Sequence, residues 1–199
     1  MGKRGAPGFT IIELLVTLAV LAVLLAVGAP QFSKMTKDNR LQTESFALRG
    51  AISAARSKAQ TLRQPVTLCR STDGVNCSTG SWGGGYITFV DADGDGQVDD
   101  AGTADSEQVI QVRAMETVGV DIQFSQGNDR VLFDMYGNAT ASTGTFTFCD
   151  DRGSSDARGM ILSAVGSLSN SVDDGAGDDS ADIPDDHLGA DLSCPGEAS

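Results

Sequence analysis

An apolar run from Phe9 to Ala29 constrains this chain more than any other part of its sequence. An α-helix needs about 20 apolar residues to cross the hydrocarbon core of a bilayer, and the run reaches that length. Glu13, near its start, is the one charged residue inside the run. Because a carboxylate is costly in lipid unless it has a partner, Glu13 is interpreted first as a functional group whose partner lies elsewhere.

Two simpler interpretations of this segment compete with that one. Lys3 and Arg4 before the run, and the small residues at its end, are typical of a secretory signal peptide. The run is long for that role, Glu13 lies inside it, and Pro30 follows the small residues where proline usually blocks cleavage. The second alternative is a plain membrane anchor in which the Glu13 carboxyl is protonated.

The residues Gly8-Phe9-Thr10-Ile11-Ile12-Glu13-Leu14 resemble the leader region of type IV pilins and type II secretion pseudopilins. This resemblance implies that a prepilin peptidase cuts between Gly8 and Phe9 and methylates the new amine of Phe9. It also implies that Glu13 pairs with the N-terminal amine of a neighbouring subunit in a filament. That amine is the partner which the carboxylate needs in lipid.

The length of 199 residues and the absence of a solenoid-type repeat indicate one globular domain on an anchor helix. We expect a leader peptide at residues 1–8, a transmembrane and assembly helix at 9–30, an amphipathic second half of this helix at 31–64, and a β-domain with an acidic tail at 65–199. Lys3 and Arg4 favour a cytoplasmic N-terminus, so the chain is expected to cross the inner membrane once and to place its β-domain in the periplasm.

Residues 9 to about 63 are predicted to form one long helix. Apolar residues recur in its second half at steps of three, four and seven, namely at Leu41, Leu48, Ile52, Ala55, Ala59 and Leu62. This face is expected to pack in a core against a sheet. Pro30 is expected to kink or locally break the helix. Gln64-Pro65 is expected to end it, because the residue before proline avoids the helical conformation.

Beyond Pro65 the pattern changes to short strands separated by turn residues. The expected strands cover residues 66–69, 86–90, 109–112, 120–124, 131–133, 145–149 and 160–163. The predicted fold class is therefore α+β, with the long N-terminal helix packed on a mainly antiparallel β-sheet domain. The order of Trp82-Gly83-Gly84-Gly85-Tyr86, Cys149-Asp150-Asp151-Arg152-Gly153 and Cys194-Pro195 resembles that of minor pilins and H-type pseudopilins, the FimT/FimU-like group.

Four cysteines follow the apolar run, at Cys69, Cys77, Cys149 and Cys194. An even number beyond a membrane-targeting segment indicates disulfides formed in an oxidising compartment, here the periplasm. Three pairings are available, and we favour Cys69–Cys77 with Cys149–Cys194 because the first two are close in sequence and the last would hold the C-terminal tail. A zinc site is disfavoured because the chain has one histidine and no Cys-x-x-Cys spacing.

The loop after residue 90 has carboxylates at alternate positions, Asp91, Asp93 and Asp95, followed by Gly96 and later by Asp99. This oxygen spacing suits Ca²⁺ and is similar to that of an EF-hand loop. The bidentate acid of the twelfth position is missing, since Gly102 stands there, although Asp105 or Glu107 could complete a non-standard site. The alternative is a solvated acidic turn, in which Asp and Gly serve the backbone.

The chain offers little for catalysis or for nucleic-acid binding. Its one histidine, His187, lies in an acidic tail at 172–191 and is expected to be solvated, so no nucleophile–histidine pair and no enzyme is predicted. Some relatives in the resembled group act as DNA receptors through a Gly-Arg-x-Arg motif. The corresponding stretch here, Gly166-Ser167-Leu168-Ser169, has no arginine, and the net charge of −13 repels phosphate.

The resemblance and the residues together predict a minor pilin or pseudopilin. This would be a structural subunit of a type IV pilus or a type II secretion pseudopilus, assembled through its N-terminal helix. The expected partners are prepilin peptidase, other major and minor pilins or pseudopilins, and the inner membrane. A DNA- or calcium-binding module at a pilus tip is the alternative function, and no cofactor other than Ca²⁺ is expected.

Overall fold

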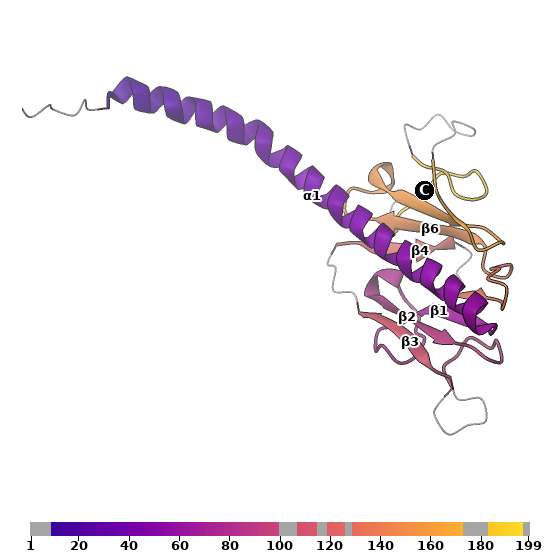
Figure 1. Cartoon of the computed structure of the whole chain (residues 1–199). Coiled ribbons are helices and arrows are strands. Elements are labelled where there is room, and N and C mark those ends of the chain that lie inside the picture. Colours follow the sequence, from indigo (N-terminus) through magenta and orange to yellow (C-terminus); the bar gives the residue numbers. More distant parts are fainter. Residues whose placement is uncertain (1–8, 100–106, 115–118, 126–128, 173–182, 197–199) are drawn as a thin grey trace, which may run out of the picture. The chain divides into compact units, whose positions relative to one another are not determined.

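The computed structural model describes residues 9–99, 107–114, 119–125, 129–172 and 183–196 (Figure 1). It divides into two compact units, residues 1–39 and residues 40–199. One helix, α1, extends from Ile11 to Leu62 and contributes to both units. The predicted α+β class is confirmed, because a long apolar helix is combined with antiparallel sheets.

Local residues define both ends of α1. At its start, Thr10 Oγ1 accepts a hydrogen bond from the backbone N–H of Glu13 at 3.2 Å, which satisfies a donor of the first helical turn. At its end, Arg63 adopts a left-handed conformation with a φ of 55°, a common way to terminate a helix. Pro30 lies inside the helix, so the local break predicted there does not occur. Proline removes one backbone hydrogen bond, and the turns on both sides remain intact.

Within the second unit, the helix buries the predicted apolar face. Leu41, Leu48, Ile52, Ala55 and Ala59 are all 0% exposed and belong to the main core. The prediction for Leu62 was wrong, because this last helical residue is 43% exposed. It precedes the turn at Arg63, where the chain leaves the helix before it enters the first strand. In Figure 1 this half of α1 runs across strands of both sheets.

The described part of the β-domain contains two four-stranded sheets, a topology that the sequence left open. The first has the order β3-β2-β1-β5, with β3 at Val109–Ala114, β2 at Gly85–Val90, β1 at Val66–Arg70 and β5 at Arg130–Phe133. The second has the order β4-β6-β7-β8, with β4 at Asp121–Phe124, β6 at Gly144–Cys149, β7 at Arg158–Leu162 and β8 at Leu168–Asn170. All pairs are antiparallel. β8 was not predicted, since its three residues carry little alternation.

Aromatic side chains connect the elements of this domain. Trp82, from the short 3-10 helix Trp82–Gly84, is buried and meets the Phe146 ring edge-on at 5.2 Å between centroids. Phe124 of β4 stacks on Phe146 of β6 at 4.2 Å. Trp82 precedes β2 of the first sheet in the sequence, but its ring packs on Phe124 and Phe146 of the second sheet. The two sheets and the buried face of α1 therefore share one core.

The buried helix face supplies the first testable prediction. Leu48→Ala is expected to lower the free energy of unfolding by about 3 kcal/mol, because it removes a fully buried side chain and leaves a cavity. Phe46→Ala, two residues away on the same helix, is the matched control: Phe46 is 61% exposed, so its loss is expected to cost less than about 1 kcal/mol. Urea unfolding of the full chain in detergent micelles measures both values. Equal losses would contradict the assignment of this face.

Candidate functional site

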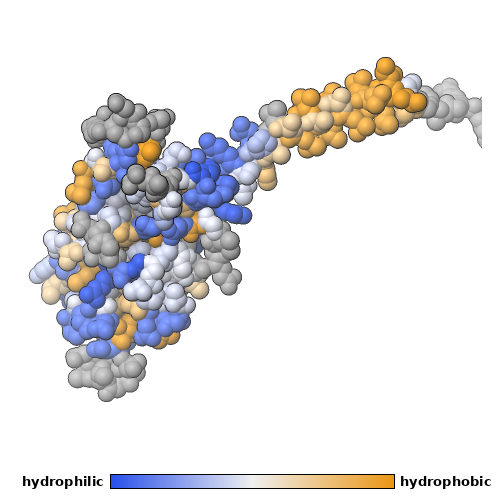
Figure 2. All heavy atoms as spheres, turned by 180° about the vertical axis from the view of Figure 1, so that it is seen from behind, coloured by the Kyte–Doolittle hydropathy of each residue, from blue (hydrophilic) through white to orange (hydrophobic). Residues whose placement is uncertain are grey.

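The N-terminal part of α1 presents apolar side chains on all sides. From Phe9 to Leu25, every large apolar side chain is more than half exposed, with Phe9 at 81%. Figure 2 shows this stretch as continuous orange surface. Within the described part of the chain, α1 is the one helix that is long and apolar enough to cross a membrane. A helix that is hydrophobic all round must be covered by lipid or by other helices.

Glu13 lies in the first turn of α1, where the sequence interpretation missed a second possible role. The residues Thr10-Ile11-Ile12-Glu13 match a capping box, in which the first residue accepts the N–H of the fourth and the fourth side chain reaches back. The forward bond, from Glu13 N–H to Thr10 Oγ1, is present. A carboxylate at this position also interacts favourably with the positive end of the helix dipole. Glu13 therefore has a local role at the start of α1. A test of its role in assembly must distinguish the two roles.

The other residues of the predicted processing and assembly site are less informative. Gly8, the predicted cleavage position, lies outside the described residues, while Phe9 begins them and is exposed. Pro30 is exposed within α1.

The cysteines form the two disulfides favoured from the sequence. Cys69, in β1, is joined to Cys77, and Cys149, at the end of β6, is joined to Cys194. The second bond lies in a small apolar cluster with Ala157, Leu192 and Ile183. It thus attaches the C-terminal segment 183–196 to the second sheet.

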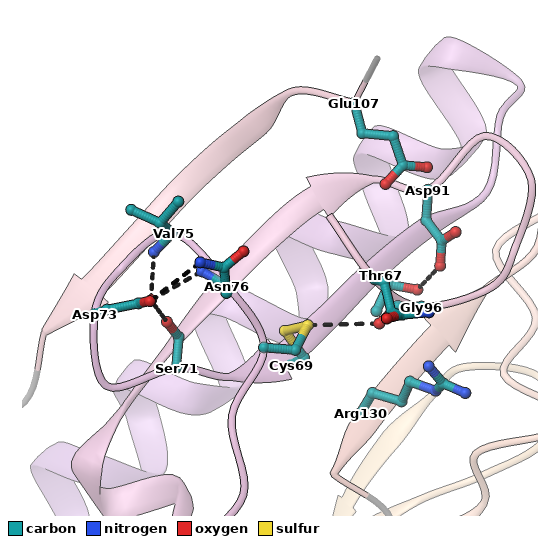
Figure 3. Close-up of a disulfide and its surroundings, with 12 residues drawn as sticks. Thr67, Cys69, Ser71, Asp73, Val75, Asn76, Asp91, Gly96, Glu107 and Arg130 are labelled. Atoms are coloured by element: carbon teal, nitrogen blue, oxygen red, sulfur yellow. Dashed lines mark hydrogen bonds between the residues drawn. A yellow bond between two sulfur atoms is a disulfide. The ribbon is translucent and has the colours of Figure 1, made fainter. Parts of the chain in front are cut away.

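The acidic loop lies beside the first disulfide (Figure 3). One carboxylate oxygen from each of Asp91, Asp93 and Asp95 lies within 4.8 Å of the others. Asp99 is not part of this group. Gly96 has a φ of +74°, a left-handed conformation that favours glycine, and a Cβ there would contact the Arg130 side chain. Arg130 donates to the backbone carbonyl of Asp95 at 2.6 Å, and Cys77 Sγ lies 3.5 Å from the carbonyl of Gly96.

Asp91 differs from the other two acids because it is 0% exposed. Its Oδ2 accepts a hydrogen bond from the Thr67 hydroxyl of β1 at 2.5 Å. Its Oδ1 is buried and has no hydrogen-bond partner among the residues that the structure describes. A buried carboxylate oxygen without a partner carries a desolvation penalty, and this makes Asp91 the unusual member of the group.

Glu107, which precedes β3, closes the loop from the other side. Its Oε1 accepts the N–H of Ala92 at 2.7 Å, and its Oε2 accepts the N–H of Asp99 at 3.4 Å. Burial raises the pKa of Glu107, and the nearby carboxylates of Asp91 and Asp93 raise it further, against the effect of these two hydrogen bonds. Of the two acids expected to complete the site, Glu107 holds the loop backbone but is not part of the group formed by Asp91, Asp93 and Asp95, and Asp105 lies outside the described residues.

In the acidic tail, the structure differs from the prediction for His187. Residues 173–182, with most of its aspartates, lie outside the described residues. His187 is not solvated as predicted: its side chain is 14% exposed, and its Nδ1 lies 3.1 Å from Thr145 Oγ1. Since Thr145 is 0% exposed, the hydroxyl of this pair lies in the interior of the domain. It joins the tail to β6, and a tail contact of this kind leaves no periodic signal in a sequence.

Comparisons with known proteins agree with this architecture. The family model described as type II transport protein GspH matches residues 46–166, and the prokaryotic N-terminal methylation motif matches residues 3–29. The type IV minor pilin FimU of Pseudomonas aeruginosa, in a P21 crystal form, has a similar fold, with 19% identity, a TM-score of 0.51, and coverage of 68% of this chain and 91% of its own. Its P65 crystal form gives 18% identity, a TM-score of 0.48, and coverage of 65% and 90%. None of the curated proteins compared matches the chain.

Proposed function

Since the chain belongs to the family of type II transport protein GspH, we propose that it is a minor pilin or pseudopilin which assembles into a filament through residues 9–30. The observation that carries this proposal is the exposed apolar N-terminal part of α1, which continues into a disulfide-bonded β-domain. Such a helix needs lipid before assembly and neighbouring helices after it. The family and the fold are those of structural pilin subunits, and no catalytic activity is proposed.

The methylation motif implies processing by prepilin peptidase. In our proposal the leader at residues 1–8 is removed after Gly8, and the new amine on Phe9 is methylated. Residues 9–30 then form the transmembrane and assembly segment, 31–64 continue the helix, and 65–199 form the exported domain. In the filament, Glu13 pairs with the N-terminal amine of a neighbouring subunit, and Pro30 sets a bend.

The proposed location is the inner membrane, with one membrane crossing and the β-domain in the periplasm. Two disulfides favour an oxidising compartment for this domain, because cytosolic thiols are kept reduced. Assembly would proceed by helix packing and polar contacts between subunits, since transfer from lipid to a helix bundle gives little hydrophobic gain. The proposed partners are other pilins or pseudopilins.

A gene-deletion strain tests this function and identifies the machine. The strain is expected to lose either sheared surface pili or type II secreted proteins, both measured from the same culture, and a plasmid copy of the gene is expected to restore the loss. Loss of pili alone would assign the chain to a type IV pilus, and loss of secretion alone to a type II pseudopilus. A strain that retains both at normal levels would contradict the proposed function.

A further inference from the structure

The loop between β2 and β3 brings three carboxylates to one point. One oxygen each of Asp91, Asp93 and Asp95 lies within 4.8 Å of the others. Calcium binds oxygen at 2.3–2.6 Å, so opposite ligands on one ion are separated by about 4.6–5.2 Å. The three oxygens are therefore close enough to share a single Ca²⁺ ion after small adjustments of their side chains.

The buried carboxylate of Asp91 is the independent observation that points to a ligand. Asp91 is fully buried, and Thr67 satisfies its Oδ2 but nothing described satisfies its Oδ1. Buried carboxylates in proteins are normally paired with a cation or coordinate a metal, because the desolvation penalty of the charge is otherwise uncompensated. The described residues provide no such compensation for Oδ1 of Asp91.

Basic side chains do not neutralise the group. Among the described residues, none forms an ion pair with Asp91, Asp93, Asp95 or Glu107. Arg130, the basic residue that contacts the loop, donates to the backbone carbonyl of Asp95 and not to a carboxylate. Glu107 lies outside this group of three acids and holds the loop through the backbone N–H groups of Ala92 and Asp99. Figure 3 shows Glu107 beside Asp91.

We propose that Asp91, Asp93 and Asp95 bind one Ca²⁺ ion, and that Glu107 positions the loop by accepting backbone N–H groups from Ala92 and Asp99. The donors are all oxygens, which excludes metals that prefer nitrogen or sulfur. Several carboxylates on a glycine-containing loop suit the variable coordination of Ca²⁺ better than the strict octahedron of Mg²⁺. The ion supplies the positive charge that the buried carboxylate of Asp91 needs.

Thermal unfolding of the full chain in detergent micelles tests the site. A concentration of Ca²⁺ about 100-fold above its Kd is expected to raise Tm by about 5–10 °C relative to EDTA. Mg²⁺ at the same concentration, and NaCl at the same ionic strength, are expected to give less than half of this shift. Equal shifts with all three salts would show that the salts act by screening the net charge, and this would overturn the proposal. The absence of a shift at about 10 mM Ca²⁺ would also overturn it, because this concentration exceeds the Kd of even the weak calcium sites of extracellular proteins.

Two variants separate ligation from general charge effects. Asp93→Asn removes an exposed ligand, so the fold is expected to survive while the Ca²⁺ affinity measured by calorimetry falls at least about tenfold. Asp151→Asn is the matched control, because Asp151 is exposed in a different turn and its loss changes the net charge equally. Equal affinity in the wild type and Asp93→Asn would overturn the assignment, as would an equal loss in both variants.

Asp91→Asn distinguishes a metal ligand from a purely structural carboxylate. In EDTA this variant is expected to unfold at the same Tm as the wild type or higher, because the amide oxygen still accepts from Thr67 and the unpaired charge is gone. In Ca²⁺ it is expected to lose the stabilisation. A variant that is less stable than the wild type in EDTA, or that keeps its Ca²⁺ shift, would contradict the proposal.

Discussion

Glu13→Ala is expected to remove the protein from filaments while leaving its membrane insertion and its β-domain unchanged. The amount recovered in sheared filaments, relative to the membrane fraction, is expected to fall at least about tenfold, which corresponds to about 1.4 kcal/mol of assembly free energy. An acidic side chain costs about 2.5–3.5 kcal/mol at the centre of a membrane, and less near an interface. Pairing with a neighbouring amine would offset this cost in the filament. The expected loss of assembly free energy is therefore smaller than the full cost of an unpaired carboxylate at the membrane centre.

The capping geometry at Thr10 makes Glu13→Gln the more informative variant. Glutamine also serves in a capping box, so this change preserves the hydrogen bonding of the cap and removes only the charge. Glu13→Gln is expected to assemble as poorly as Glu13→Ala. Thr10→Val, the matched control, removes the cap and keeps the charge, and is expected to assemble within about twofold of the wild type. Normal assembly of Glu13→Gln would show that the charge pairing is not needed.

Loss of the Cys149–Cys194 disulfide is expected to destabilise the β-domain more than loss of Cys69–Cys77. The sequence separations are 45 and 8 residues, so loop-closure entropy gives about 4 kcal/mol for the first and about 2.5 kcal/mol for the second. The longer bond also attaches the segment with Leu192 and His187 to the second sheet. Its loss is therefore expected to release these contacts as well.

Double alanine variants of each pair measure this difference. Urea unfolding of the full chain in detergent micelles can be followed by the fluorescence of Trp82, which is the one tryptophan in the chain and is completely buried in the core. Cys149→Ala with Cys194→Ala is expected to lower the unfolding midpoint clearly more than Cys69→Ala with Cys77→Ala. Equal midpoints, or a larger loss from the shorter bond, would contradict the loop-entropy argument for these two disulfides.

Features that depend on neighbouring residues could be predicted from the sequence. The sequence predicts a helix at residues 9 to about 63, and α1 extends from Ile11 to Leu62. The two ranges agree because the recurring apolar residues and Pro65 define the helix locally. The longer strands were predicted near their true positions by alternation, and β8 was missed because it is short. The capping box at Thr10 and Glu13 is equally visible in the sequence, because its two residues are three positions apart.

The sequence by itself determined the apolar anchor, the amphipathic helix, the antiparallel strands and the oxygen spacing of the acidic loop, since each rests on residues a few positions apart. Only the tertiary structure decided that the strands separate into two sheets, that Asp91 is buried against Thr67, that Glu107 closes its loop, and that His187 reaches Thr145. These contacts join residues from 15 to 42 positions apart. They depend on which strands pair and on which side chains share the core, and no local period encodes that choice.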